Sequence, residues 1–404
     1  MEIRQRVAAL IACVVGTVLS GAAAQLVDPA TQPGWQHFYN NEFDAAIAFF
    51  QKDVAARPDD PDGWDHLAQA ILYREMYRNG ALESQMVSGT NPFLRRAKFN
   101  VTPEVRNGFR GAIDKAIALG DAELARNPND THALYALSVA HGLRANYLFL
   151  VEKAWIDALH DASASSKYSN RLVEVDPNFL DANIIQGVQN YIVGNLPLHW
   201  KVLGFLSGFR GDRELGIRQL QLVAERGVLS KYDARILLAA IYRRERRSQD
   251  AIPLLKGLAE LFPRNYLFRL EEVQMYSDLG DKAAALAVLA EVGRFRREGK
   301  PGYQQLPEEK LAYIRGNLLF WYDDLDAALT SLREATRHAD QLDLGTAQLA
   351  WFRLGQTLDL MNRHAEAVPA YREAEQVAVQ SDIGAEAKSY ISNPYHRKRT
   401  HQAG

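Results

Sequence analysis

The sequence predicts an all-α protein, built as a right-handed solenoid of about eight helix hairpins with two insertions. Three observations lead to this prediction. Apolar and small residues recur with a period of about 34 residues along most of the 404-residue chain. Helix-stopping Pro residues at 58, 128 and 177 are followed by Asx residues that can cap the next helix. No alternating run rich in Val, Ile and Thr competes with this pattern, so we expect no sheet.

The clearest repeat begins at Gln348 and supplies a large residue, then a small one, at helical spacing in each of two helices. Its key residues are Trp351, Leu354, Gly355 and Leu358, followed by Ala367, Tyr371 and Ala374. This spacing resembles the tetratricopeptide repeat, in which small residues let the two helices of a hairpin approach closely. The resemblance implies antiparallel helix pairs that stack side by side.

Weaker copies of the same frame precede this repeat. They lie around Gly34, Trp64, Leu134, Gly187, Ala239, Tyr276 and Gly316. The second and third copies are too long for the period, which predicts insertions at about 74 to 105 and 142 to 165. We therefore predict N-terminal repeats with insertions over 25–230, C-terminal repeats over 231–384, and a tail over 385–404.

The first 24 residues resemble a secretory signal peptide. Arg4 and Arg6 precede an apolar run from Val7 to Leu19, and Ala22 to Ala24 form a small-residue cleavage site. The run is shorter than the roughly 20 residues that span a bilayer. We expect a periplasmic or secreted protein that can contact a membrane but does not span it after cleavage. The alternative is a lipoprotein signal at Leu10–Cys13, which would leave Cys13 lipidated.

Composition excludes several classes of function. Lys and Arg number 47 against 49 Asp and Glu, giving a net charge of −2, so we expect no nucleic-acid binding. Cys13 is the only cysteine, so a chain cleaved after residue 24 has no disulfide, no thiolate metal site and no cysteine nucleophile.

Catalytic and cofactor motifs are not recognisable. The glycines at 211 and 216 have phosphate-loop spacing but lack the following Lys and Ser/Thr. The ten histidines include no His-Glu-x2-His pattern, and no Gly-x-Ser-x-Gly elbow occurs. We therefore expect no enzyme activity, no cofactor and no metal. A His beside an Asp or Glu in a deep cleft would argue against this expectation.

Residues 177 to 228 carry a closer resemblance. The segment includes Pro197, Gly211, Asp212, Arg213 and Gly216. It is similar to the eukaryotic tetratricopeptide family typified by the fungal inclusion body clearance protein and its animal relatives. The resemblance implies a scaffold without catalysis. Because this chain opens with an export signal, an intracellular clearance role is not carried over.

In proteins of the tetratricopeptide type, the first helices line a concave groove. The second, fifth, ninth, twelfth and thirteenth places of each unit face this groove, which selects Gln69, Tyr73, Tyr135, Tyr191, Arg243, Arg244, Asn317, Trp321 and Gln356. This mixture of aromatic, amide and Arg side chains suits a protein or peptide partner. The basic cluster from Arg243 to Arg247 is either a carboxylate socket or a solvated helix end.

An apolar ligand is the alternative to a peptide. Trp200, Phe205 and Phe209 cluster in a short apolar stretch that the two insertions could cap. A lipid carrier or sensor would use such a site. The basic segment from His396 to His401 is expected to be a frayed, solvated tail.

Overall fold

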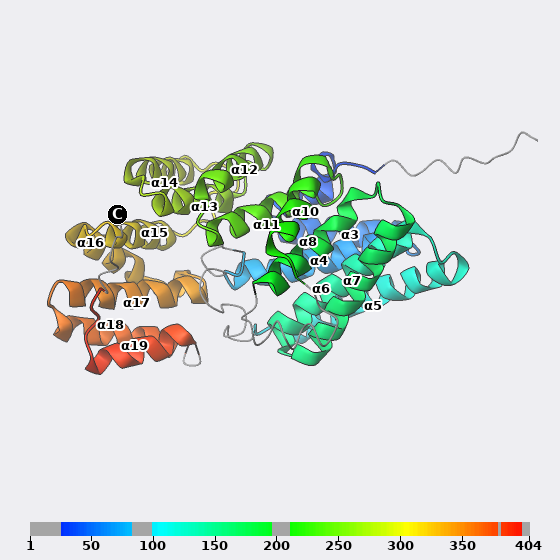
Figure 1. Cartoon of the computed structure of the whole chain (residues 1–404). Coiled ribbons are helices and arrows are strands. Elements are labelled where there is room, and N and C mark those ends of the chain that lie inside the picture. The colour runs from blue at the N-terminus through cyan, green and yellow to red at the C-terminus, as the bar shows by residue number, and fades with distance from the viewer. Residues whose placement is uncertain (1–25, 83–98, 196–210, 379–380, 398–404) are drawn as a thin grey trace, which may run out of the picture.

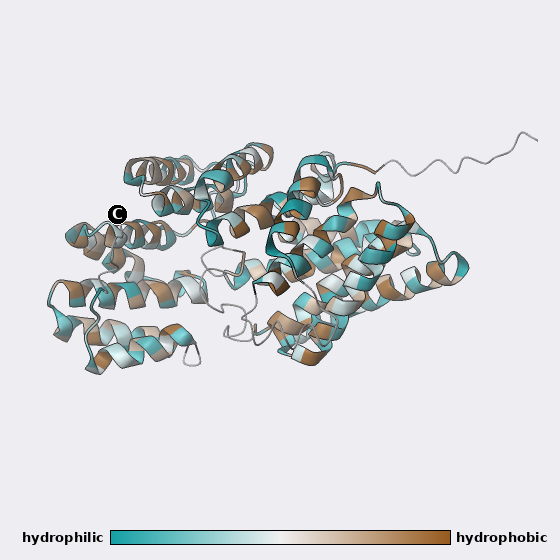
Figure 2. Cartoon of the chain, in the orientation of Figure 1, coloured by the Kyte–Doolittle hydropathy of each residue, from teal (hydrophilic) through white to brown (hydrophobic). Residues whose placement is uncertain are grey.

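The computed structural model describes residues 26–82, 99–195, 211–378 and 381–397. These residues form seventeen α-helices and no strand, which confirms the prediction of an all-α repeat fold. Consecutive helices pair into eight hairpins, and the hairpins stack along the chain (Figure 1). Hydrophobic and hydrophilic residues alternate around the helices, as expected for helices that bury one face (Figure 2).

Each hairpin has a first and a second helix. The first helices are α2 (Pro33–Tyr39), α4 (Pro61–Arg78), α6 (Thr131–Tyr147), α8 (Asn183–Gly194), α11 (Lys231–Arg244), α13 (Tyr266–Asp278), α15 (Glu308–Trp321) and α17 (Leu344–Leu360). The second helices are α3 (Phe43–Ala56), α5 (Pro103–Arg126), α7 (Trp155–Val175), α10 (Arg213–Arg226), α12 (Ser248–Leu261), α14 (Lys282–Arg297), α16 (Leu325–Arg337) and α18 (His364–Val377). A final helix, α19 (Asp382–Ser392), packs on α18.

Asx residues begin many of these helices, as the sequence predicts. The Asp60 carboxylate accepts the backbone N–H of Asp62 at the start of α4, and Asp130 accepts that of Ala133 in α6. Asp212 and Asp343 cap α10 and α17 in the same way. Each cap satisfies a backbone donor that the first helical turn leaves without a partner.

Small residues mark the crossings within the hairpins. A Cβ atom on Gly355 would lie 2.5 Å from the ring of Tyr371 in α18, and one on Gly316 would lie 2.6 Å from Leu332 in α16. Only glycine allows these close approaches. The predicted small-residue contacts of the repeat are therefore confirmed.

Buried side chains form two large cores. One extends from Trp35 to Met275, and the other from Tyr266 to Ala387. The cores meet at α13, and Tyr77 packs against both. The division into repeats before and after residue 230 stays a prediction about domain organisation.

The first hairpin also packs on hairpins far along the chain. The Tyr39 hydroxyl donates to Asp233 of α11 at 3.1 Å, and its ring lies 4.8 Å from that of Phe262. Asn41 donates to Asn265 at the start of α13 at 2.6 Å. Tyr77 of α4 also bonds Tyr266 of α13 at 2.6 Å. The N-terminal hairpins therefore close on themselves.

The predicted insertions differ from each other in the structure. The first lies between α4 and α5, and part of it falls outside the described residues. The second, at 142 to 165, does not fold as a separate capping element, because its residues extend α6, form a π-helical turn at Leu148–Glu152, and begin α7. No described helix combines the length and the apolar character needed to cross a membrane.

The predicted tail is partly folded. Residues from 385 belong to α19, whose Ala387 is fully buried. Residues 393 to 397 then return toward α15, where Arg397 donates to the Phe320 carbonyl oxygen. The expectation of a frayed segment is therefore wrong for Arg397, because its side chain is bonded to α15. His396 is exposed.

Candidate functional site

Three of the predicted groove residues lie inside the closed N-terminal part. Gln69 is buried, the ring of Tyr73 lies 5.0 Å from that of Phe38, and the Tyr135 hydroxyl bonds Ser230 at 2.9 Å. Burial raises the pKa of Tyr73 and of Tyr135. These side chains tie the N-terminal hairpins together and do not form an open face.

Three further predicted residues lie near the ends of α8 and α11. The Tyr191 hydroxyl donates to Glu245 at 2.8 Å, and Arg243 Nε donates to Asp278 of α13 at 2.9 Å. Arg244 is exposed. The carboxylate socket considered for the basic cluster is thus filled at Arg243 by an acid of the next hairpin.

The remaining three predicted residues come together on α15 and α17. Arg353 of α17 links them: its Nε donates to Asn317 Oδ1 at 2.8 Å, and its Nη1 donates to Gln356 Oε1 at 2.6 Å. The Arg353 guanidinium carbon lies 4.8 Å from the centre of the Trp321 ring. We name these four residues, Asn317, Trp321, Arg353 and Gln356, the α15–α17 surface.

The electrostatics of this surface are dominated by Arg353. Burial lowers its pKa, yet a guanidinium stays protonated at neutral pH. Its cation also faces the ring of Phe320 at 4.3 Å. Among the described residues, no carboxylate forms an ion pair with Arg353, so amide oxygens and aromatic rings stabilise the charge.

Trp321 gives this surface its apolar part. Its residue surface is 53% exposed, whereas the adjacent Phe320 is fully buried. Aromatic and Arg side chains in a partly desolvated setting are the residue types that dominate protein interfaces. The arrangement can stack on an aromatic or apolar side chain while Arg353 stays fixed by its two amides.

Residues 393 to 397 lie against the same two hairpins. The Tyr395 N–H donates to Asp359 Oδ2 of α17 at 2.7 Å. Arg397 donates to the Phe320 carbonyl oxygen at 2.6 Å and to Asp323 Oδ1 at 3.0 Å. The tail thus crosses from α17 to α15.

Sequence reasoning missed Arg353, Asp359 and the tail. Arg353 occupies the sixth place of its repeat, which the groove rule does not include, although it follows Asn317 by 36 positions. This spacing of about one repeat is the signal that could have paired the two residues. Asp359 carried no sequence signal, because its role depends on the returning tail.

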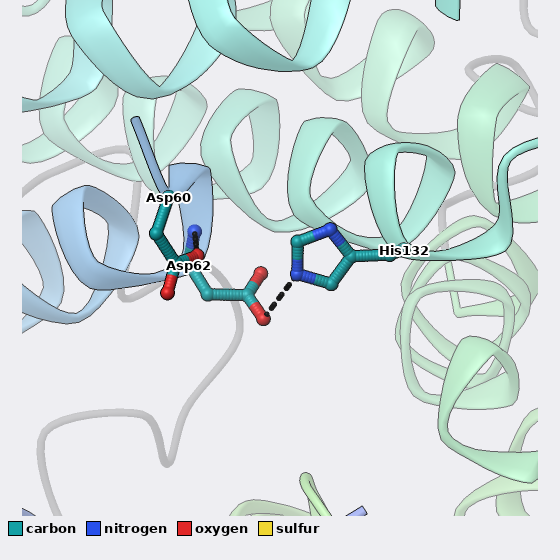
Figure 3. Close-up of side chains that lie close together, drawn as sticks. All are labelled: Asp60, Asp62 and His132. Carbon is teal, nitrogen blue, oxygen red and sulfur yellow. Dashed lines mark hydrogen bonds and ion pairs between the residues drawn. The ribbon is translucent and has the colours of Figure 1, made fainter. Parts of the chain in front are cut away.

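A group of two carboxylates and a histidine lies elsewhere, between α4 and α6. Asp60, Asp62 and His132 are close enough to be considered as cation ligands (Figure 3). His132 Nε2 lies 2.9 Å from Asp62 Oδ2, and this bond raises the pKa of His132 to about 9. Asp60 is paired with Arg57 at 2.6 Å. Asp62 and His132 therefore form an ion pair that joins two hairpins, and the protonated imidazole would have to release its proton to bind a metal.

A His beside an Asp or Glu in a deep cleft would favour an enzymatic role, and two His–Asp pairs can be compared with this criterion. His132 borders an open depression of about 470 Å³ rather than a deep cleft. The buried pair His141 and Asp161, 2.7 Å apart, shares its carboxylate with Arg144. This sharing is typical of a structural ion pair rather than of a poised base.

The apolar site that the sequence analysis gives as an alternative, Trp200, Phe205 and Phe209, lies outside the described residues.

Comparison with known proteins identifies one tetratricopeptide repeat in the chain. The solved structure of yeast Tom70 has 13% sequence identity and a TM-score of 0.42, over 90% of this chain and 88% of that chain. No curated protein matches the chain, and the resemblance at 177 to 228 stays a prediction. A family model of the tetratricopeptide repeat matches residues 349–378, which form most of α17 and α18. With its eight stacked hairpins, the chain has an all-α helical repeat fold, in which residues 349–378 match the tetratricopeptide repeat.

Proposed function

We propose that the chain is an exported, non-catalytic scaffold that binds an extended peptide segment of a partner protein on the α15–α17 surface. The observation that carries this proposal is the convergence of Asn317, Trp321 and Gln356 on one partly buried cation, Arg353. A fixed cation beside an exposed indole offers one polar and one apolar contact to the same ligand.

The geometry favours a peptide over a globular surface. The two first helices lie side by side, and Arg353 bridges them. Since neighbouring helices pack about 8 to 10 Å apart, an extended peptide of three residues reaches from one to the other. Arg353 can donate to a peptide carbonyl or carboxylate, and Trp321 can cover an apolar side chain.

The compartment and the wider role belong to the same proposal. The signal-like residues 1–24 support export to a periplasmic or secreted location, with membrane contact but no span in the described helices. The scaffold role agrees with what the resemblance at 177 to 228 implies. No described contact favours a lipid ligand over a peptide.

Selection from a random twelve-residue peptide library tests this function. The mature chain starting at Gln25 should enrich a family of related peptides. Trp321→Ala should lose at least tenfold in affinity for them, because the indole supplies the exposed apolar area. Ile156→Ala is the matched control, since Ile156 is 71% exposed on α7 in another hairpin. Equal loss in both variants, or no enrichment at all, would overturn the proposal.

A further inference from the structure

The segment of residues 393 to 397 lies on the hairpins as an extended peptide. It follows the end of α19 and has no helical structure. Tyr395 and Arg397 are partly buried, whereas His396 between them is exposed. Alternation of inward and outward side chains is the pattern of an extended chain against a surface.

Specific contacts fix this segment at two successive hairpins. On α17, the buried carboxylate of Asp359 accepts the Tyr395 N–H. The same carboxylate accepts the Tyr371 hydroxyl at 2.7 Å and contacts His364 Nδ1 at 2.7 Å. Asp359 is therefore a rigid acceptor that the hairpin holds in place for a backbone N–H.

At α15 the contacts select a cation. The Phe320 carbonyl lies in the last turn of the helix, where the helix dipole is negative, and Asp323 adds a full negative charge. Arg397 binds both oxygens, and its guanidinium carbon lies 4.8 Å from the Phe320 ring. A basic side chain thus satisfies an anionic helix end and stacks on an aromatic ring.

The segment of residues 393 to 397 lies beside the α15–α17 surface, and both contact the Phe320 ring. The Phe320 ring faces Arg353 at 4.3 Å and Arg397 at 4.8 Å, so the tail lies beside the residues that we assign to partner binding. Tyr395 also contacts this ring, with 6.3 Å between the centroids. A second extended peptide on Phe320 and Asp323 therefore has to displace the tail.

We propose that residues 393 to 397 are an internal occupant of the peptide site. The matching partner is an extended segment that carries an aromatic residue two positions before a basic residue. Such a segment would use Asp359 for its backbone, and Asp323 with the α15 carbonyl for its cation. This inference rests on the proposed function and adds the chemistry of the partner and its regulation by the tail.

The expected size of the competition follows from the tether. A short tether gives an effective concentration on the order of 1 mM. If the separate segment binds with a dissociation constant of about 0.1 mM, the attached tail weakens a competing peptide about tenfold. A site of this strength is closed at rest but opens to a peptide that binds more tightly.

Fluorescence anisotropy with a labelled synthetic peptide of residues 393–404 tests the competition. The peptide should bind a chain that ends at Ser392 at least tenfold more tightly than the full chain. Should the shortened chain unfold, Arg397→Glu in the full chain opens the same site, with His396→Ala as the control because His396 is exposed. Equal binding to the closed and opened chains, or no binding to either, would overturn the inference.

The library-selected peptides separate this inference from the proposed function. Peptides that need Trp321 but bind the full and shortened chains equally would leave the proposed function standing and remove the role of the tail. Peptides with an aromatic-x-basic pattern that bind the shortened chain more tightly would support both. Loss of all peptide binding in both chains would count against the proposed function itself.

Discussion

The N-terminal and C-terminal hairpins use the same repeat but differ in what covers the face of their first helices. In the N-terminal part, Tyr39 of the first hairpin reaches Asp233 of α11, which lies 194 positions away in the sequence. In the C-terminal part, Trp321 keeps 53% of its surface exposed, and the neighbouring cover is a five-residue segment. Closure by whole hairpins yields a core, whereas coverage by a short segment leaves a site that a ligand can enter.

Long-range contacts decide which part becomes closed. Asn41, Glu42 and Tyr39 find partners around Asp233 and Arg264, so the first hairpin is held by hydrogen bonds and stacked rings together. Together these contacts must offset the entropy of closing a loop of roughly 200 residues. The tail encloses a far shorter loop with fewer contacts, and segments held by few contacts open with less free energy.

The largest expected effect compares one aromatic residue from each part. Tyr39→Ala should destabilise the N-terminal core by about 3 to 5 kcal/mol, since its 2% exposed ring packs against those of Trp35 and Phe262. Trp321→Ala should cost about 1 kcal/mol, because half of the residue is already in water. Urea unfolding measures both, and Tyr39→Phe isolates the hydroxyl bond. Similar costs for the two alanine variants would contradict the comparison.

In both parts of the chain, the two helices of a hairpin should depend on glycine where they cross. Gly216→Ala would place a Cβ 2.6 Å from the backbone of Gly187 and Tyr191, and Gly355→Ala would place one 2.5 Å from the Tyr371 ring. Each should destabilise by about 2 to 3 kcal/mol. Gly257→Ala is the control, because nothing lies within 4 Å of its Cβ and helix propensity should improve by about 0.5 to 1 kcal/mol. Thermal unfolding measures these changes. An unchanged unfolding midpoint for Gly216→Ala would show that the helices do not cross closely at this residue.

The third prediction concerns the pH dependence of closure. Burial raises the pKa of Asp233 to about 7, with Tyr39 opposing and Asp181 reinforcing the shift. Between about pH 4 and 7 the folded state holds a proton that the unfolded state lacks, so stability falls as pH rises. Asp233→Asn should therefore stabilise the protein by about 1 to 2 kcal/mol at pH 8, after discounting for partial exposure, and by nothing below pH 4. Urea unfolding at both pH values measures this difference, and a constant difference would refute the assignment.

The smallest predicted effect belongs to the ion pair between α4 and α6. Because the Asp62 bond raises the pKa of His132 to about 9, its stabilisation is complete below about pH 6.5 and disappears as pH rises through 9. His132→Gln should cost at most about 1 kcal/mol at pH 6, since the ring is half exposed, and nothing at pH 10. Thermal unfolding across this range checks the window. Addition of zinc should not change the midpoint if the group is an ion pair rather than a metal site.

Much of the fold could be predicted because it depends on the spacing of small residues and Pro along the sequence. The recurrence of small residues at Gly187, Gly316 and Gly355 marks helix crossings, and Pro58 and Pro128 end the preceding helices. Closure of the N-terminal part could not be predicted, since the contact of Tyr39 with Asp233 depends on how the curvature of all intervening hairpins accumulates. Likewise, an excess over the repeat period of about 34 residues does not distinguish an inserted element from two lengthened helices, as at 142 to 165.

The candidate site was predictable in part for the same reason. The groove rule selected Asn317, Trp321 and Gln356, which one side chain then joins, but it selected Tyr73 and Tyr135 equally, which lie inside the closed part. A positional rule identifies the face of a helix and contains no information on what later covers that face. Whether these residues bind a partner stays a prediction.

Hydrogen exchange with a library-selected peptide bound tests the central claim most directly. The claim is that a peptide can reach the first-helix face at the α15–α17 surface, whereas this face is enclosed at α4 and α6. Peptide binding should slow exchange in segments 308–321 and 344–360 and leave segments 61–78 and 131–147 unchanged. Protection that appears in α4 and α6 instead would contradict the account.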